Sequence, residues 1–237
     1  MTPEVLSVDN HLLFVAKPAG LPTVPDESGD ASLFEWAKDW VAREFQKPGA
    51  VFLGVVHRLD RPVSGVVLFA RTSKAAARLS QQFRARTVRK LYLGIGAGEP
   101  AARAGLVEQW LVKDEVARRV RPAPRDSPGA REARTRWRVL AVRGSRTLLC
   151  FEPLTGRPHQ LRAAAASLGT PLLGDVKYGA KVPLANRSIA LHALSLAVEH
   201  PTRGEPVELR CTPSGEVWLP FATDIGEVDC SRSLQGD

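Results

Sequence analysis

The feature that most limits the fold of this chain is a succession of strand-like segments with few helices between them. Runs rich in aliphatic and β-branched residues lie at 90–95, 105–111, 133–142, 146–153, 189–198 and 205–211. Strands joined by short connections pair antiparallel, whereas parallel neighbours need a long crossover that is usually a helix. The sequence therefore predicts an α+β fold with flanking helices and a mixed, largely antiparallel sheet rather than a doubly wound one.

Two amphipathic helices are predicted before position 90. The first begins with a capping-box pair, Ser32 and Glu35, and the second covers 73–87. Apolar residues recur at helical spacing, which gives the predicted buried faces: Leu33, Ala37, Trp40, Val41 and Phe45 in the first helix, and Ala76, Leu79 and Phe83 in the second. Buried strands are predicted at 11–18 and 65–72.

Composition places the chain among globular proteins. With 237 residues and 44% hydrophobic content, it can bury a core as one large domain or two small ones. No apolar run reaches the roughly 18 residues of a membrane span, and the first residues lack a secretory signal pattern. Cys150, Cys211 and Cys230 are odd in number and far apart, which gives neither a disulfide framework nor a zinc pair. We therefore expect a cytoplasmic, metal-free protein with no membrane partner.

The positive charge of the chain is concentrated in one segment. Between positions 118 and 146, ten arginines stand against Asp126 and Glu132, which gives +8, the formal net charge of the whole protein. Planar guanidinium groups suit phosphate, so the segment predicts nucleic-acid binding; a solvated loop that keeps the protein soluble is the alternative. Pro and Gly at 121–131 predict a mobile loop between strands.

One short polar stretch, "HRLDRPVSG" at 57–65, places Asp60 on a tight connection directly before a predicted strand. Functional residues are often displayed at such positions, although Asp and Pro are also ordinary turn residues. Two further segments are polar where a core is expected. Lys90 and Tyr92 share one face of a strand, and a helix is predicted to begin near Pro158 and to stop at Gly169. The start of that helix can hold an anion.

Four strings resemble one known family. "HRLDRPVSG", "KLY", "LTGRPHQLR…LGTPLLGDVKYG" and "LHALSLAVEHP" occur in the order and spacing typical of the RluA family of pseudouridine synthases, and "HLLFVAKPAGL" is similar to its opening strand. The resemblance covers roughly residues 5 to 222. It implies the pseudouridine synthase fold, with an active-site cleft across the sheet, and an RNA partner.

The resemblance also implies roles for individual residues. Asp60 is expected to be the catalytic aspartate, with Arg162 as its partner. Arg58 is expected to enter the RNA where a uridine has been flipped out, and Tyr92 to pack against the flipped base. The residues expected to contact substrate are Arg58, His57, Lys90, Arg157, His159 and Gln160.

The chain departs from the family pattern at two positions: Val63 and Pro158 each stand where Thr is usual. Neither is a reacting group, but both affect the expected local hydrogen bonds. We further expect a catalytic domain at 1–222, no accessory N-terminal RNA-binding domain, a flexible tail at 223–237, and a monomer. The expected substrate is a stem-loop of ribosomal or transfer RNA.

Isomerising uridine to pseudouridine breaks the bond between the sugar and a ring nitrogen and rejoins the sugar to ring carbon 5. No atoms are gained or lost, so we expect no redox cofactor or nucleotide energy source. A carboxylate can act as a covalent catalyst, and a neighbouring guanidinium such as that of Arg162 would keep Asp60 ionised. Tyr92 would stack on uracil first and move a proton second. Attack on the sugar, attack on the base and proton abstraction from the sugar all remain open for Asp60.

Two competing functions follow from the same residues. A hydrolase that used Asp60 to cut the nucleoside bond would release free uracil, whereas isomerisation keeps the base attached. A non-catalytic RNA-binding relative would show no turnover. The presence of Asp60, Tyr92 and Arg162 together favours an isomerase.

Overall fold

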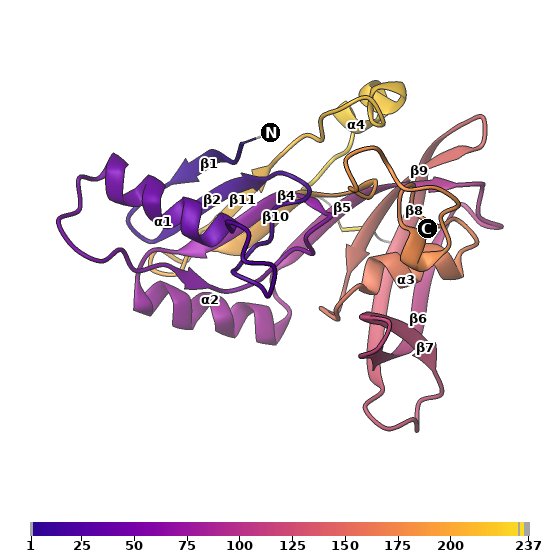
Figure 1. The fold of residues 1–237 in the computed structure, drawn as a ribbon, viewed down its shortest axis with the longest axis horizontal. Helices are drawn as coiled ribbons and strands as arrows, with labels where there is room; N and C mark the ends of the chain where they lie inside the picture. The colour runs from indigo at the N-terminus through magenta and orange to yellow at the C-terminus, as the bar shows by residue number, and fades with distance from the viewer. Residues whose placement is uncertain (1, 232, 235–237) are drawn as a thin grey trace. The chain divides into compact units, whose positions relative to one another are not determined.

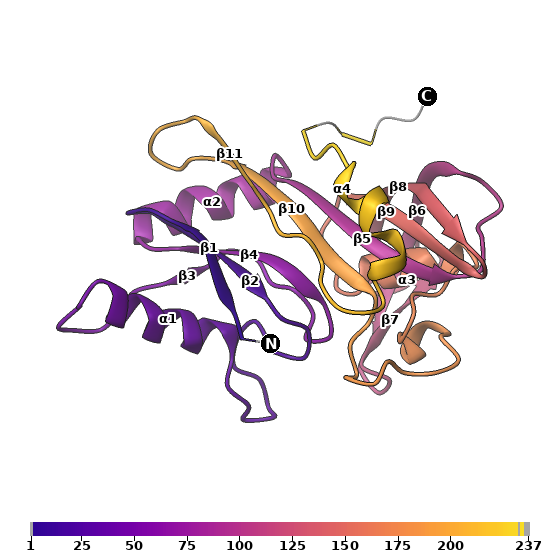
Figure 2. The same ribbon diagram turned by 90° about the horizontal axis from the view of Figure 1, so that it is seen from above.

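The computed structural model describes residues 2–231, 233 and 234, and the chain forms two compact units (Figures 1 and 2). The first unit contains Met1–Arg89 and Ala193–Cys211, and the second contains Lys90–His192 and Thr212–Asp237.

The first unit contains strands in the order β1-β2-β4-β10, with β3 paired to β4 and β11 paired to β10. The pairs β1–β2, β2–β4, β3–β4 and β10–β11 are antiparallel. The strands are β1 (Glu4–Val8), β2 (Leu12–Lys17), β3 (Gly54–Val55), β4 (Ser64–Ala70), β10 (Leu191–Glu199), most of which belongs to this unit, and β11 (Pro206–Arg210).

Helix α1 (Leu33–Glu44) begins with the predicted capping box, in which Ser32 and Glu35 bond to each other's backbone N–H groups. Leu33, Ala37 and Val41 are buried as predicted. Phe45 is different, because it follows the helix end and is 41% exposed, with the Arg71 guanidinium 4.0 Å from its ring centroid.

Helix α2 (Ser73–Ala85) packs beneath the same strands. Its Leu79 lies in one core cluster with Phe14 of β2 and Leu68 of β4. Phe69, the next residue of β4, points to the opposite face, where the Phe34 ring of α1 lies 6.1 Å away between centroids. The two helices therefore contact opposite faces of β4, which is buried along almost all of its length.

The strands of the second unit pair antiparallel in the order β5-β9-β8-β6-β7. Its strands are β5 (Arg89–Ala97), β6 (Ala104–Asp114), β7 (Arg119–Ala123), β8 (Arg131–Arg143) and β9 (Arg146–Pro153). Figure 1 shows β6 and β7 as a hairpin at the lower right. The prediction of a loop at 121–131 is wrong in part, because residues 121–123 belong to β7. Pro122 is tolerated within this strand because β7 lies at the edge of the sheet.

Helix α3 (Gln160–Ser167) covers one face of these strands. Its Ala163 packs with Leu111, Val120 and Ala133, which come from β6, β7 and β8. The helix begins two residues later than predicted: Pro158 lies in the preceding turn, and the N-cap residue is His159. Gly169, with a φ of +72°, follows the helix end as predicted.

The C-terminal segment lies against the opposite face. It contains the 3₁₀ helix η2 (Leu219–Phe221) and helix α4 (Ala222–Gly226). Glu152 of β9 accepts hydrogen bonds from the Ser233 hydroxyl and the Leu234 N–H. The sequence predicts a flexible tail at 223–237. Within this range, Ile225, Val228 and Leu234 are buried. Positions 232 and 235–237 lie outside the described residues.

The predicted fold class, a mixed and largely antiparallel sheet with flanking helices, is confirmed. The predicted core strands and the three helices all occur, with shifts of a few residues at their ends.

Candidate active site

The "HRLDRPVSG" stretch forms a short connection that ends in a tight turn. The Val63 N–H donates to the Asp60 carbonyl at 3.0 Å, and β4 begins at Ser64. Exposure alternates along the stretch: Arg58 is exposed, Leu59 is buried and Asp60 is half-buried. Arg58 and Asp60 are therefore both more exposed than the residue between them, as expected where side chains alternate along an extended segment.

Gly65 closes this stretch because no other residue fits its backbone. Its φ is +119°, in a region that side chains rarely adopt. A Cβ atom at this position would lie 2.3 Å from the Ala193 carbonyl oxygen of β10. The end of the motif is thereby held against a neighbouring strand.

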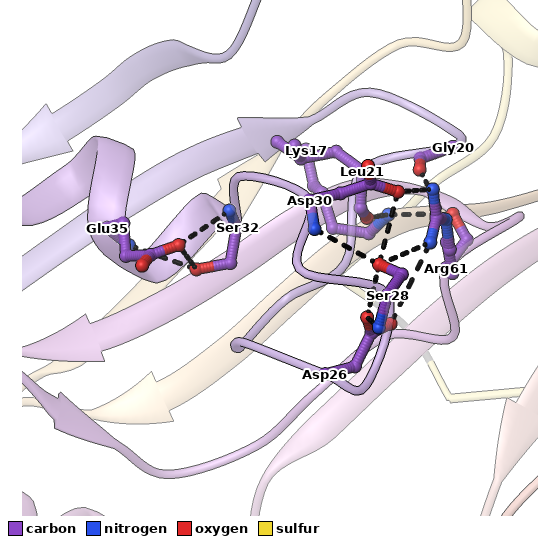
Figure 3. A network of polar contacts seen from close by, with 9 residues as sticks. All are labelled: Lys17, Gly20, Leu21, Asp26, Ser28, Asp30, Ser32, Glu35 and Arg61. Atoms are coloured by element: carbon purple, nitrogen blue, oxygen red, sulfur yellow. Dashed lines mark hydrogen bonds and ion pairs between the residues drawn. The ribbon is translucent and has the colours of Figure 1, made fainter.

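Buried polar groups fix the middle of the motif. The Thr23 hydroxyl donates to the Leu59 carbonyl at 2.8 Å and accepts from the Leu59 N–H at 3.1 Å. Arg61 donates from Nε to the Gly20 carbonyl at 2.9 Å and pairs with Asp30 (Figure 3). These contacts hold the residues on both sides of Asp60.

Lys17, at the end of β2, is a buried charged residue that contacts the backbone of the motif. It is 2% exposed, and its ammonium donates to the Pro18 carbonyl at 3.0 Å. It also donates to the carbonyls of Leu21 at 2.7 Å and Arg61 at 3.2 Å (Figure 3). Burial lowers the pKa of Lys17 to about 7, while the negative charge of Asp60 raises it. Lys17 therefore both shapes the turn and interacts electrostatically with Asp60.

His57 has a structural hydrogen bond. Its Nε2 accepts the Leu68 N–H of β4 at 2.9 Å, and its ring stacks on Phe83 of α2 with centroids 5.0 Å apart. A nitrogen that accepts a backbone N–H carries no proton, so the ring is neutral with its proton on Nδ1.

In the second unit, Lys90 and Tyr92 are half-buried and alternate with the buried Leu91 and Leu93. Tyr92 is paired with Phe151 of β9, which is paired with Trp137 of β8. Paired residues point to the same face, and Trp137 shares that face with Ala133, which packs on α3. The sheet thus places Tyr92 and α3 on one face.

The turn before α3 is fixed by Gln160. Its Oε1 accepts from the Thr155 hydroxyl at 2.7 Å and from the Arg157 N–H at 3.0 Å. Its Nε2 donates to the Arg134 carbonyl and the Thr135 hydroxyl, each at 2.9 Å. These four bonds use both donors and both acceptor positions of the amide, so Gln160 fixes the turn rather than offering an open hydrogen-bonding group.

The neighbouring predicted residues also contact the protein. Arg157 donates from Nε to the Glu132 carbonyl of β8 at 2.9 Å. His159 has a φ of +50°, and its Nδ1 lies 3.0 Å from the hydroxyl of Tyr178.

Arg162 forms a two-point ion pair with Asp175. Its Nε and Nη2 each lie 2.7 Å from a carboxylate oxygen, and the two residues are 5% and 1% exposed. Its guanidinium carbon lies 4.9 Å from the Tyr178 ring centroid. The pairing of Arg162 with Asp60, which the family resemblance implies, stays a prediction.

Arginines of the basic segment differ in their partners. Arg134 pairs with Glu108 at 2.7 Å, Arg136 with Glu152 at 3.7 Å and Arg143 with Asp224 at 2.6 Å. In contrast, Arg121, Arg125, Arg131 and Arg138 form no ion pair with any residue that the structure describes. Arg125 lies instead over the Trp110 ring, 5.4 Å from its centroid.

The described part of the chain contains neither a metal-binding cluster nor a membrane-spanning helix. No group of three or more His, Cys, Asp and Glu side chains there could hold a metal ion. No helix within 2–231 and 233–234 combines the length and the hydropathy that a membrane span needs.

Sequence reasoning missed four residues that contact the predicted ones or their backbone: Lys17 and Thr23 in the first unit, and Asp175 and Tyr178 in the second. A lysine that ends an otherwise apolar strand was a usable signal for Lys17. Asp175 and Tyr178 lie in the string "GDVKYG", which marks the family but gives no indication of their contacts.

Comparison with known proteins gives the family. The model of the RNA pseudouridylate synthase family matches residues 11–167. An uncharacterized RNA pseudouridine synthase of Zymomonas mobilis is 36% identical over 94% of this chain and 97% of its own length. Ribosomal large subunit pseudouridine synthase C of Vibrio vulnificus is 33% identical over 90% of this chain, which spans 66% of that relative.

A solved structure agrees with these matches. The structure titled human RNA pseudouridylate synthase domain containing 4 superposes with a TM-score of 0.75 and 25% identity, over 93% of this chain and 90% of that one. The family predicted from the motifs is therefore confirmed, and the chain belongs to the RNA pseudouridylate synthases, a family of RNA isomerases.

Proposed function

We propose that this protein converts specific uridines in structured RNA to pseudouridine, with Asp60 as the essential carboxylate. The observation that carries the proposal is the construction of the Asp60 turn. Buried contacts from Thr23 and Lys17 fix its backbone, while the Asp60 side chain is left half-buried on the outer side. Such a rigid support is what a reacting group needs, because small displacements of a catalytic group lower the rate strongly.

The other predicted residues have separate roles in this proposal. Arg58, which is exposed, enters the base stack as the target nucleotide leaves it. Tyr92 supplies a flat surface for the flipped uracil, and Arg162 keeps the reacting carboxylate ionised by donating hydrogen bonds to it. Lys90 and Arg157 are proposed to contact phosphate, and His57 and His159 to support the residues that do.

Ribosomal RNA is the substrate to test first. The Vibrio relative is named a ribosomal large subunit pseudouridine synthase, and a stem-loop of ribosomal RNA is therefore our proposed substrate, with transfer RNA as the second choice. We propose that the protein acts as a monomer in the cytoplasm.

The experiment uses RNA whose uridines carry tritium at ring carbon 5. Forming pseudouridine joins the sugar to this carbon, and the tritium is released to water. A hydrolase would instead release labelled uracil, and a protein that only binds RNA would release neither. Tritium in water with no free uracil, together with mapped pseudouridine, is the expected result; uracil release, or binding without turnover, would contradict the proposal.

A further inference from the structure

The segment after α3 contains two side chains that contact Arg162 and to which the motifs assign no role. Asp175 binds the Nε and Nη2 edge of the guanidinium with both carboxylate oxygens. Tyr178, at the end of the 3₁₀ helix η1 (Val176–Tyr178), lies against the guanidinium with a separation of 4.9 Å between the ring centroid and the guanidinium carbon. One residue therefore fixes an edge of the guanidinium and the other supports its face.

Tyr178 is itself held on two sides. Its hydroxyl accepts the Val120 N–H of β7 at 2.9 Å and donates to the Val120 carbonyl at 3.1 Å. The hydroxyl has only one hydrogen, so the Nδ1 of His159, at 3.0 Å, must be the donor in the third contact. The ring cannot turn away from Arg162 without breaking these bonds.

We propose that Asp175 and Tyr178 are positioning residues for Arg162, an inference that rests on the proposed function. An arginine side chain has several rotatable bonds, and a bidentate carboxylate fixes the plane of its guanidinium as well as its place. Asp175 uses Nε and one direction of Nη2, so Nη1 and the second Nη2 hydrogen are the donors that this arrangement aims elsewhere.

The burial of this pair supports a functional reading. Arg162 is 5% and Asp175 is 1% exposed, and a buried ion pair can often be replaced by apolar residues with no loss of stability. Stability alone is therefore a weak reason to place an arginine there. A fixed direction for its remaining donors is a stronger one, since preorganised donors act on a reacting group without rearrangement.

The test is a double-mutant cycle on the single-turnover rate with enzyme in excess over a pseudouridine substrate RNA. We expect Asp175→Asn to lower the rate by about tenfold or more, with the RNA dissociation constant changed less than about threefold. In an Arg162→Met background, Asp175→Asn should change the rate by less than about threefold, because its target is gone. If Asp175→Asn lowers the rate by the same factor in the Arg162→Met background as in the wild type, the proposal is overturned.

A matched control is Glu152→Gln, which alters another buried acid of the same unit that pairs with an arginine. It should lower the melting temperature and leave the single-turnover rate unchanged. An equal rate loss in Glu152→Gln and Asp175→Asn would show that any buried charge change has this effect, and would refute positioning.

Tyr178→Leu leaves the ion pair between Arg162 and Asp175 in place. It provides a second double-mutant cycle with Arg162→Met, to be used if Asp175→Asn does not fold. Its rate loss should likewise disappear in the Arg162→Met background, and Tyr178→Phe, which keeps the ring, should lose less than Tyr178→Leu. Failure of the proposed function is distinguishable, because the wild-type protein would then form no pseudouridine. If the wild type is active but the rate losses of the single variants are independent of Arg162, the positioning role is refuted and the proposed function still stands.

Discussion

The arginines of the basic segment should contribute unequally to RNA binding, and the salt dependence of binding measures this. Each phosphate contact adds roughly 0.7 to 0.9 to the slope of log affinity against log salt. Arg121, Arg125 and Arg131 have no acidic partner in the described part of the chain, so each can bind a phosphate without breaking an ion pair. Replacing all three by Gln should reduce the slope by about 2.1 to 2.7.

A matched control is the triple Gln variant of Arg134, Arg136 and Arg143, which removes the same charge. These residues already pair with Glu108, Glu152 and Asp224, so a phosphate must displace a carboxylate, whose negative charge then repels the phosphate and offsets the gain. We expect its slope to change by less than about 1.

Filter-binding dissociation constants between about 50 and 200 mM salt give both slopes. Over this fourfold range, wild type should lose about 20- to 40-fold more affinity than the Arg121, Arg125 and Arg131 variant. Single-turnover rates on saturated complexes should change little. Equal slope changes in both variants would show that intramolecular pairing does not matter, and no change in either would mean that the segment serves solubility.

Three further predictions concern the Asp60 turn. Asp60→Ala and Asp60→Asn should lose turnover with RNA binding within a few-fold of wild type; activity above a few per cent in either would remove Asp60 from the catalytic role. Arg58→Ala should be severely impaired on a structured hairpin and should recover much of its rate when the target uridine lies in an unstacked bulge. Arg58→Lys should restore little of the rate on the hairpin, because lysine has no planar group to stack. Equal losses on both RNAs would exclude a role in flipping. The pKa of Lys17 falls from 10.5 in the unfolded chain to about 7 in the folded protein. Between these pH values the unfolded state binds more protons than the folded state, so the free energy of unfolding rises with pH, by about 2 kcal/mol from pH 7 to 9. Denaturant unfolding of Lys17→Met should lack this rise, and identical pH dependence in both proteins would contradict the assigned pKa.

The sequence predicts elements well where burial produces a regular pattern. β4 and β9 are apolar runs, and α1 has both a capping box and a helical stripe. It predicts poorly where pairing rather than composition makes the element. β7 is rich in Arg and contains Pro122, yet it forms because its backbone pairs with that of β6.

The site divides along a similar line. Arg58, Asp60, Tyr92 and Arg162 lie in recognisable strings, so the sequence can identify them. The groups that hold them depend on the path of the backbone. Lys17 binds carbonyls whose positions are set by two loops, and His57 accepts the Leu68 N–H, while its predicted contact with substrate stays a prediction. No spacing rule encodes a contact between a side chain and a distant backbone group.

Lys17 in the first unit and Arg162 in the second are both buried cations, and the two differ in what they supply. The partners of Lys17 are neutral carbonyls, which leave its charge uncancelled, and the electrostatic interaction with Asp60 is the consequence. Arg162 is cancelled by Asp175, so it supplies oriented donors with little net charge. Since the pKa of Lys17 is about 7, its charge varies with pH near neutrality, whereas the guanidinium stays protonated. A loss of activity on raising the pH through 7 that disappears in Lys17→Met would therefore be due to charge near Asp60, because the donors of Arg162 do not titrate in that range.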